Sequence, residues 1–303
     1  MLTDKKIPLP YIFKQVRVDV ARVFLFSVFF QLLEWFFAKY LPLVPGLLPT
    51  ILGSAISLIL AFKINQSYDR WWEARKVWGA IVNDSRSLVL QLQGFLEDDL
   101  VGANTVREAI RRIGYRQIGW CYSLGQSLRG QNPLATLEEF VSTAEIAYLR
   151  KHSNKPLALL ALHTEDLKAL RQQRALNAFE HVQLDSTLVR LCDSMGKAER
   201  INSTVFPVTY RIFVHMFIYL FLIVLSLALV ETVGLLELPI LLVSATSFFL
   251  LEKTATYLQD PFRNRPTDTP VTAIARTIEI NLKQLLNDTE IPKPVAPEEF
   301  YLM

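Results

Sequence analysis

The histidines and cysteines of this sequence are not spaced for catalysis or metal binding. They form no HExxH, HxH or CxxC pattern, so we expect neither a zinc site nor another metal site. GxSxG, P-loop and GxGxxG motifs are also missing from the sequence, and we therefore predict that the protein is not an enzyme. Cys121 and Cys192 stand alone, and we expect both to be buried, reduced thiols.

One group of apolar and small residues has a spacing that could serve a pore. Ser54, Leu58 and Phe62 lie at i, i+4 and i+8, which places them on one stripe of a helix. Apolar rings around a pore can gate by dewetting, because a partly dehydrated ion finds no replacement ligands there. The neighbouring small residues Gly53 and Ser57 permit close helix packing. A pore, an intersubunit contact and an ordinary packed helix all fit this pattern.

Arg111, Arg112 and Arg116 form a basic cluster on one predicted helix. A solvated face or an intrachain ion pair explains the cluster better than contact with nucleic acid or lipid headgroups. We therefore expect no nucleic-acid partner.

Four apolar segments indicate how the chain positions these residues. They cover residues 23–41, 47–62, 212–230 and 234–251, and their only charges are Glu34, Lys39 and Glu237. The uncharged stretch 212–230 would reach about 28 Å as a helix, close to the thickness of a hydrocarbon core. Because 51% of the 303 residues are hydrophobic and the net charge is only +3, intrinsic disorder is excluded. The alternative interpretation is that some of these segments are buried helices of a soluble core.

Lysines and arginines precede the first and third segments and follow the second and fourth. The short connections 42–46 and 231–238 contain neither residue. By the positive-inside rule both termini and the middle region are expected in the cytoplasm. We predict one subunit over 1–303, with membrane segments in 23–62 and 207–258, a cytoplasmic helical region at 63–206, and a cytoplasmic C-terminal helix and tail at 259–303.

The middle region contains few residues that would break helices. Between Thr50 and Phe206 the prolines are Pro133 and Pro156, and no alternating strand pattern is present. We expect an all-α fold with helices near 54–100, 104–130, 136–151 and 157–200, and with breaks near Gly94, Gly102, Gly130 and the two prolines.

Two longer stretches resemble the signature motifs of the bestrophin family. Residues 61–79, AFKINQSYDRWWEARKVWG, contain Arg70-Trp71-Trp72, and residues 260–286, DPFRNRPTDTPVTAIARTIEINLKQLL, begin with Asp260-Pro261-Phe262. The order of membrane segments around a helical middle also matches, so the resemblance covers nearly the whole chain.

The resemblance implies a homopentamer around one central pore, in the cytoplasmic (inner) membrane of a bacterium and in contact with its lipid. The family's neck positions carry over to Ser54, Leu58 and Phe62, where the family is usually apolar, so Ser54 departs from the pattern. An inner aperture carries over to Phe179. A gap in the alignment would move it to Glu180, His181 or Leu184, and a core aromatic is the competing interpretation of Phe179.

Animal members of the family hold calcium after the last membrane helix. Here Arg263 and Arg265 replace much of the acidic run, and Asp260 and Asp268 are the nearby carboxylates. Because calcium needs six or more oxygen ligands, we expect no calcium gating through this segment and no cofactor.

The resemblance therefore predicts an ion channel for monovalent ions. Animal relatives pass chloride, which favours an anion, although a bacterial member could pass cations. The rival hypothesis is a membrane-anchored interaction or sensor protein, whose cytoplasmic helices or proline-bearing tail 291–303 bind a partner. We expect the tail to wrap a neighbouring subunit.

Overall fold

The structure is a computed structural model that describes residues 1–2, 5, 7–37, 44–97, 102–205 and 207–303. Within these residues the chain is built from α-helices and short 3-10 turns, as predicted. It divides into two compact units. We call the first, Asp4–Trp71 with Val205–Asp260, the span unit, and the second, Met1–Thr3 with Trp72–Thr204 and Pro261–Met303, the bundle unit.

The span unit contains the apolar helices. These are α1 (Leu9–Phe37), the first part of α2 (Leu47–Phe95), α7 (Val208–Val233) and α8 (Glu237–Gln259), with the short turn η3 (Gly234–Leu236) between the last two. By length and composition each of the four helices could cross a membrane. The hairpin turn predicted at 231–237 is confirmed, and Gly234 ends α7 with a positive φ of 57° that suits glycine.

Two of these helices extend well beyond their apolar segments. α1 begins at Leu9 rather than at 23. Pro10 does not prevent this, because it lies in the first turn, where a backbone N–H has no acceptor within the helix. α2 continues through the charged residues that follow Phe62, since nothing there breaks a helix. The predicted ends of the segments 23–41 and 54–100, with Lys39, lie outside the described residues.

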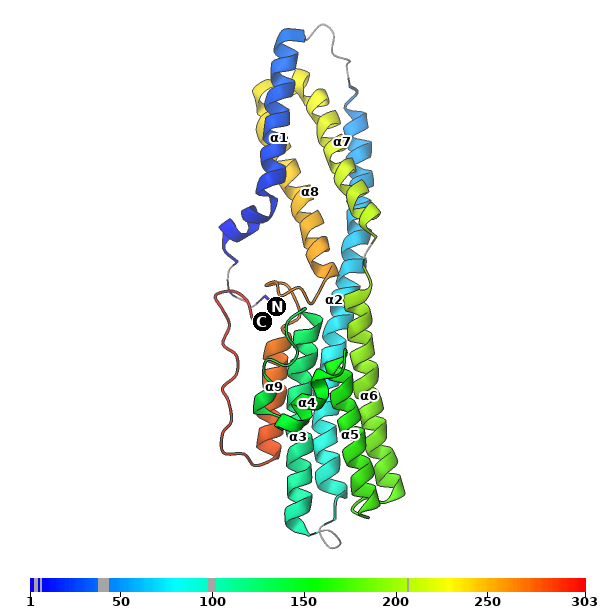
Figure 1. Cartoon of the computed structure of the whole chain (residues 1–303). Helices are drawn as coiled ribbons and strands as arrows, with labels where there is room; N and C mark the ends of the chain where they lie inside the picture. Colours follow the sequence, from blue (N-terminus) through cyan, green and yellow to red (C-terminus); the bar gives the residue numbers. More distant parts are fainter. Residues whose placement is uncertain (3–4, 6, 38–43, 98–101, 206) are drawn as a thin grey trace. The chain divides into compact units, whose positions relative to one another are not determined.

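Apolar residues from all four helices form the core of the span unit. Figure 1 shows α1, α7 and α8 running alongside one another. Their buried side chains, together with those of α2, are Val16, Val23, Ile56, Leu60, Val214, Ile218, Phe221, Leu222, Leu241, Ala245 and Phe249.

The bundle unit holds the remaining helices. They are the rest of α2, α3 (Ala103–Leu128), α4 (Thr143–Arg150), α5 (Lys155–Gln172), α6 (Ala178–Ser203) and α9 (Val271–Leu285), with the turn η2 (Leu137–Glu139) before α4. The expected breaks at Gly102 and Gly130 are confirmed, because both glycines flank α3 with positive φ. The break expected at Gly94 is also close, since α2 ends at Phe95.

Two predictions of single long helices were wrong. The helix expected at 136–151 is replaced by η2 and α4, and the one expected at 157–200 is divided into α5 and α6. In each case a capping box starts the second helix: Ser142 with Glu145, and Asn177 with Glu180. These side chains satisfy backbone N–H groups that have no partner in the first helical turn.

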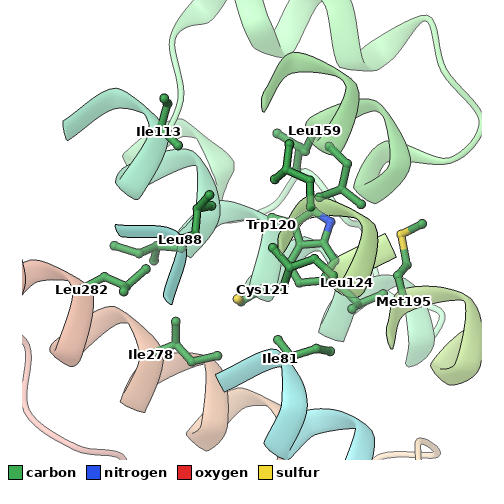
Figure 2. Packing of buried hydrophobic residues seen from close by; sticks show 14 of the residues in the cluster. Ile81, Leu88, Ile113, Trp120, Cys121, Leu124, Leu159, Met195, Ile278 and Leu282 are labelled. Carbon is green, nitrogen blue, oxygen red and sulfur yellow. The ribbon is translucent and has the colours of Figure 1, made fainter. Parts of the chain in front are cut away.

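The core of the bundle unit is apolar and tightly filled. Figure 2 shows Trp120 among Leu124, Leu159 and Met195, with side chains from α2 and α9 close by. Cys121 is buried as predicted, and burial raises the pKa of its thiol to about 12. Cys192 is exposed, so its predicted burial was wrong. Leu188, Leu191 and Met195 lie on the buried face of α6. Cys192 follows Leu191 and lies off that face, which explains its exposure.

The end of the tail pairs within its own chain. The Leu302 N–H donates to the Met1 carbonyl at 2.8 Å, and the Ala273 N–H at the start of α9 donates to the Met303 carbonyl at 3.0 Å. The last residues of the tail thus bond to their own chain, and the wrapping of a neighbouring subunit by this segment stays a prediction.

Candidate pore-lining helix

The part of α2 inside the span unit has two opposite faces. Its buried face carries Ile56, Leu60, Lys63 and Ser67. At 3.6 residues per turn, the stripe of Ser54, Leu58 and Phe62 lies about 170° away from that face. Leu58 is 60% exposed and Phe62 is 58% exposed, whereas Leu60 between them is 1% exposed. The predicted stripe is therefore the outer face of α2 within one chain.

A buried ion pair fixes this orientation. The Lys63 ammonium donates to the Glu252 carboxylate of α8 at 2.8 Å and to the Thr256 hydroxyl at 3.2 Å, and both charged side chains are buried. Lys63 follows Phe62 in sequence but lies about 100° around the helix from it, on the buried face. Because a lone buried charge is costly, this pair resists rotation of α2 about its axis.

The small residues of α2 make different contacts within the chain. Gly53 faces α7, where an added Cβ would lie 3.1 Å from the Phe221 ring, so glycine here allows packing within the chain. The hydroxyls of Ser54 and Ser57 donate to the carbonyls of Thr50 and Gly53, each at 2.8 Å. Since the Ser54 proton is used within the helix, the exposed stripe presents a hydrogen-bond acceptor at this level.

An open groove of about 950 Å³ runs along the first part of α2, as far as Leu58. Small and apolar side chains of α2, α7 and α8 line it, among them Ser54, Leu58, Leu225, Ser244 and Phe248. The groove places Ser54 and Leu58 at a surface rather than in the core of the chain.

Phe179 lies at the start of α6 in the bundle unit, and its side chain is 88% exposed. This excludes the interpretation of Phe179 as a core aromatic. Among the alternatives, Leu184 is buried, and the Glu180 carboxylate accepts the Asn177 N–H at 2.9 Å as part of the helix cap. Phe179 is therefore the most exposed apolar side chain of this turn.

The motif residues lie where the sequence passes from one unit to the other, after Trp71 and after Asp260. Trp71 packs against Tyr68 with ring centroids 6.0 Å apart, Arg70 is half-buried, and Trp72 is exposed. Asp260 ends α8. Pro261 accepts a hydrogen bond from the Thr269 N–H at 3.1 Å, and Phe262 is buried in the core of the bundle unit.

The segment after Phe262 contains one buried carboxylate, that of Asp268. Asp268 is buried, one of its oxygens accepts the Arg265 N–H at 3.0 Å, and burial raises the pKa of its carboxyl. In the described part of the chain, no group of three or more His, Cys, Asp or Glu residues is placed to hold a metal ion.

Two polar groups in the structure were not anticipated. In the span unit Asp19 of α1 is buried and accepts from Tyr219 at 3.1 Å, with His215 at 3.3 Å. The Lys63–Glu252 pair is the other. Charged residues beside apolar segments were the available signal, but their partners are too distant in sequence for spacing to pair them.

The basic cluster of α3 is held by intrachain ion pairs, as expected. Arg116 contacts Glu145 and Asp166, and Arg112 binds Asp166 at 2.8 Å. These pairs connect α3 to α4 and α5, so the cluster has a structural explanation.

Comparisons with known proteins agree on one family. Residues 10–284 match the family model described as bacterial/fungal bestrophin protein. The voltage-dependent anion channel-forming protein YneE of Escherichia coli (strain K12) is 30% identical over 92% of this chain and 89% of its own. A protein of the same description from Ralstonia nicotianae is 28% identical over 87% of this chain and 85% of its own.

A bestrophin homolog from Klebsiella pneumoniae has a solved crystal structure that superposes with a TM-score of 0.83 and 25% identity, covering 91% of this chain and all of that one. The curated relatives are named as channel-forming proteins rather than enzymes, which agrees with the missing catalytic motifs.

Proposed function

The chain belongs to the bestrophin family, and we propose that it is the subunit of a homopentameric channel that conducts monovalent ions passively across the inner membrane of a bacterium. The observation that carries this proposal is the outer face of α2. Leu58 and Phe62 are large, apolar and exposed, while the opposite face is anchored in the chain by Lys63 and Glu252. Five copies around an axis would turn these side chains into apolar rings.

The proposed neck works through its lack of ligands. At the levels of Leu58 and Phe62 an ion would lose water and gain no replacement oxygen or N–H group, so narrow rings oppose its passage and wider ones admit it. At Ser54 the side chains are smaller, so the outer ring would be wider. It would also present hydroxyl oxygens, because the Ser54 proton is bonded to the helix. The tightest part of the neck is therefore expected at Leu58 and Phe62.

The proposed orientation, with both termini and the bundle unit in the cytoplasm, is supported by the distribution of lysine and arginine. Phe179 would then form a second, inner constriction, since it is exposed at the start of α6. The curated relatives are named as anion channel-forming proteins, which favours chloride as a permeant ion.

We also propose that calcium does not gate the channel through the segment 263–268. Arg263 and Arg265 oppose cation binding there, and Asp268 is buried against the backbone. Opening of the purified channel by micromolar calcium in a bilayer would refute this.

Ion flux into liposomes that contain only this protein tests the proposed function. We expect flux that scales with the amount of protein. Sealed liposomes with fully inserted protein would instead favour the membrane-anchored sensor. Five-fold symmetry in images of the detergent-solubilised particle would test the assembly.

A further inference from the structure

The exposed stripe of α2 continues past Phe62 into polar residues. Asn65 and Asp69 lie at i+7 and i+11 from Leu58, and both side chains are exposed. At 3.6 residues per turn both fall within about 20° of the middle of the stripe formed by Ser54, Leu58 and Phe62. Along this face, a small polar residue is therefore followed by two large apolar residues, then by an amide and finally by a carboxylate.

The other charges of this part of α2 point elsewhere. Between Leu47 and Trp71 the charged residues are Lys63, Asp69 and Arg70. Lys63 is buried in its pair with Glu252, and Arg70 is half-buried and lies about 100° around the helix from Asp69. Asp69 is thus the one formal charge on the stripe in this range.

We propose that Asp69 sets the charge preference of the ion pathway. The copies of Asp69 from the five subunits would form a ring of carboxylates on the cytoplasmic side of the apolar neck, with Asn65 between this ring and Phe62. This proposal rests on the proposed channel function. A ring of negatively charged carboxylates would concentrate cations and repel anions at the mouth of the neck. Asp69 therefore reduces the share of current carried by anions in this protein.

The expected size follows from simple electrostatics. One unit charge about 8 Å from an ion in water changes the local ion concentration about twofold, and several charges in a narrow passage have a larger combined effect. The Asn65 amide offers both N–H donors and a carbonyl oxygen, so it can contact ions of either sign and adds no bias of its own.

The experiment measures reversal potentials of the purified protein in planar bilayers under a potassium chloride gradient. We expect Asp69→Asn to raise the chloride-to-potassium permeability ratio at least about twofold, and Asp69→Lys to raise it further. Asp69→Asn removes the charge while nearly preserving size, so it should leave assembly unchanged, which size-exclusion chromatography in detergent can verify.

A matched pair of variants tests the face of the helix. Asn65→Asp adds a carboxylate on the stripe and should lower the permeability ratio. Gln66→Glu adds the same charge one residue later, on an exposed position about 100° away, and should leave the ratio unchanged.

An unchanged ratio in assembled Asp69→Asn channels would overturn the proposal, as would equal shifts for Asn65→Asp and Gln66→Glu. If Leu58→Ala changes the conductance while the Asp69 variants have no effect, the proposed neck stands and the role of Asp69 falls. If the wild-type protein carries no current, both fall.

Discussion

The two units of this chain bury their largest side chains to very different extents. In the bundle unit Trp78 and Trp120 are fully buried, whereas in the span unit Trp35, Leu58 and Phe62 are exposed. The bundle unit thus has a complete core of its own. The apolar surface of the span unit needs lipid or further subunits to cover it, since a soluble chain rarely exposes so much. The comparison teaches that an exposed residue of α2 has to be explained by what surrounds the chain.

The units also differ in how they hold buried charge. In the bundle unit Arg116 shares two carboxylates, Glu145 and Asp166, that remain partly accessible. In the span unit Lys63 and Glu252 are both buried, and each is the counter-charge of the other. The predictions below begin with this pair, where the largest effect is expected.

Lys63→Met should lower the free energy of unfolding by about 3–5 kcal/mol, because it leaves the Glu252 carboxylate buried without a counter-charge. Thermal unfolding of the detergent-solubilised protein measures this. The double variant Lys63→Met with Glu252→Met should recover much of the loss. Equal instability of the single and double variants would mean that the ion pair does not anchor α2.

His163→Leu should remove a pH dependence from the stability of the bundle unit. His163 is fully buried, and burial, followed by the charge of Arg116, holds its pKa well below the usual 6.5. Below pH 6.5 the unfolded chain therefore binds a proton that the folded chain does not, so stability falls as pH drops, by up to about 1.4 kcal/mol per pH unit. Unfolding of the wild type and the variant between pH 7 and 5 compares the slopes, and identical slopes would contradict the assignment.

Asn177→Ala should cost about 1 kcal/mol by removing the cap of α6, where the Asn177 side chain accepts the N–H groups of Phe179 and Glu180. Denaturant unfolding measures the loss. Because Phe179 lies in this first turn, the variant should also alter conductance if Phe179 forms the inner constriction. A stability loss with unchanged current would separate the cap from the ion pathway.

The sequence was most informative where local rules decide the structure. The stripe of Ser54, Leu58 and Phe62 follows from helical spacing, and the apolar segments follow from composition. The division between α5 and α6 was missed because no proline or glycine marks it, although Asn177 and Glu180 carry a capping-box pattern. The Lys63–Glu252 pair could not be predicted, since it joins residues far apart in sequence through the packing of α2 on α8.

The exposure of Cys192 has a similar lesson. An isolated cysteine is usually buried, but position on the helix decides: Leu191 faces the core of the bundle unit and Cys192, one residue later, does not. Residue type was a weaker guide here than the apolar periodicity of α6.

Single-channel recording of the double variant Leu58→Ala with Phe62→Ala tests the central claim most directly. Both side chains are exposed, so the substitutions should leave the fold intact and widen the apolar rings. We predict a higher conductance with less gating than the wild type in planar bilayers. An unchanged single-channel current from the fully assembled variant would show that these residues do not line the pore.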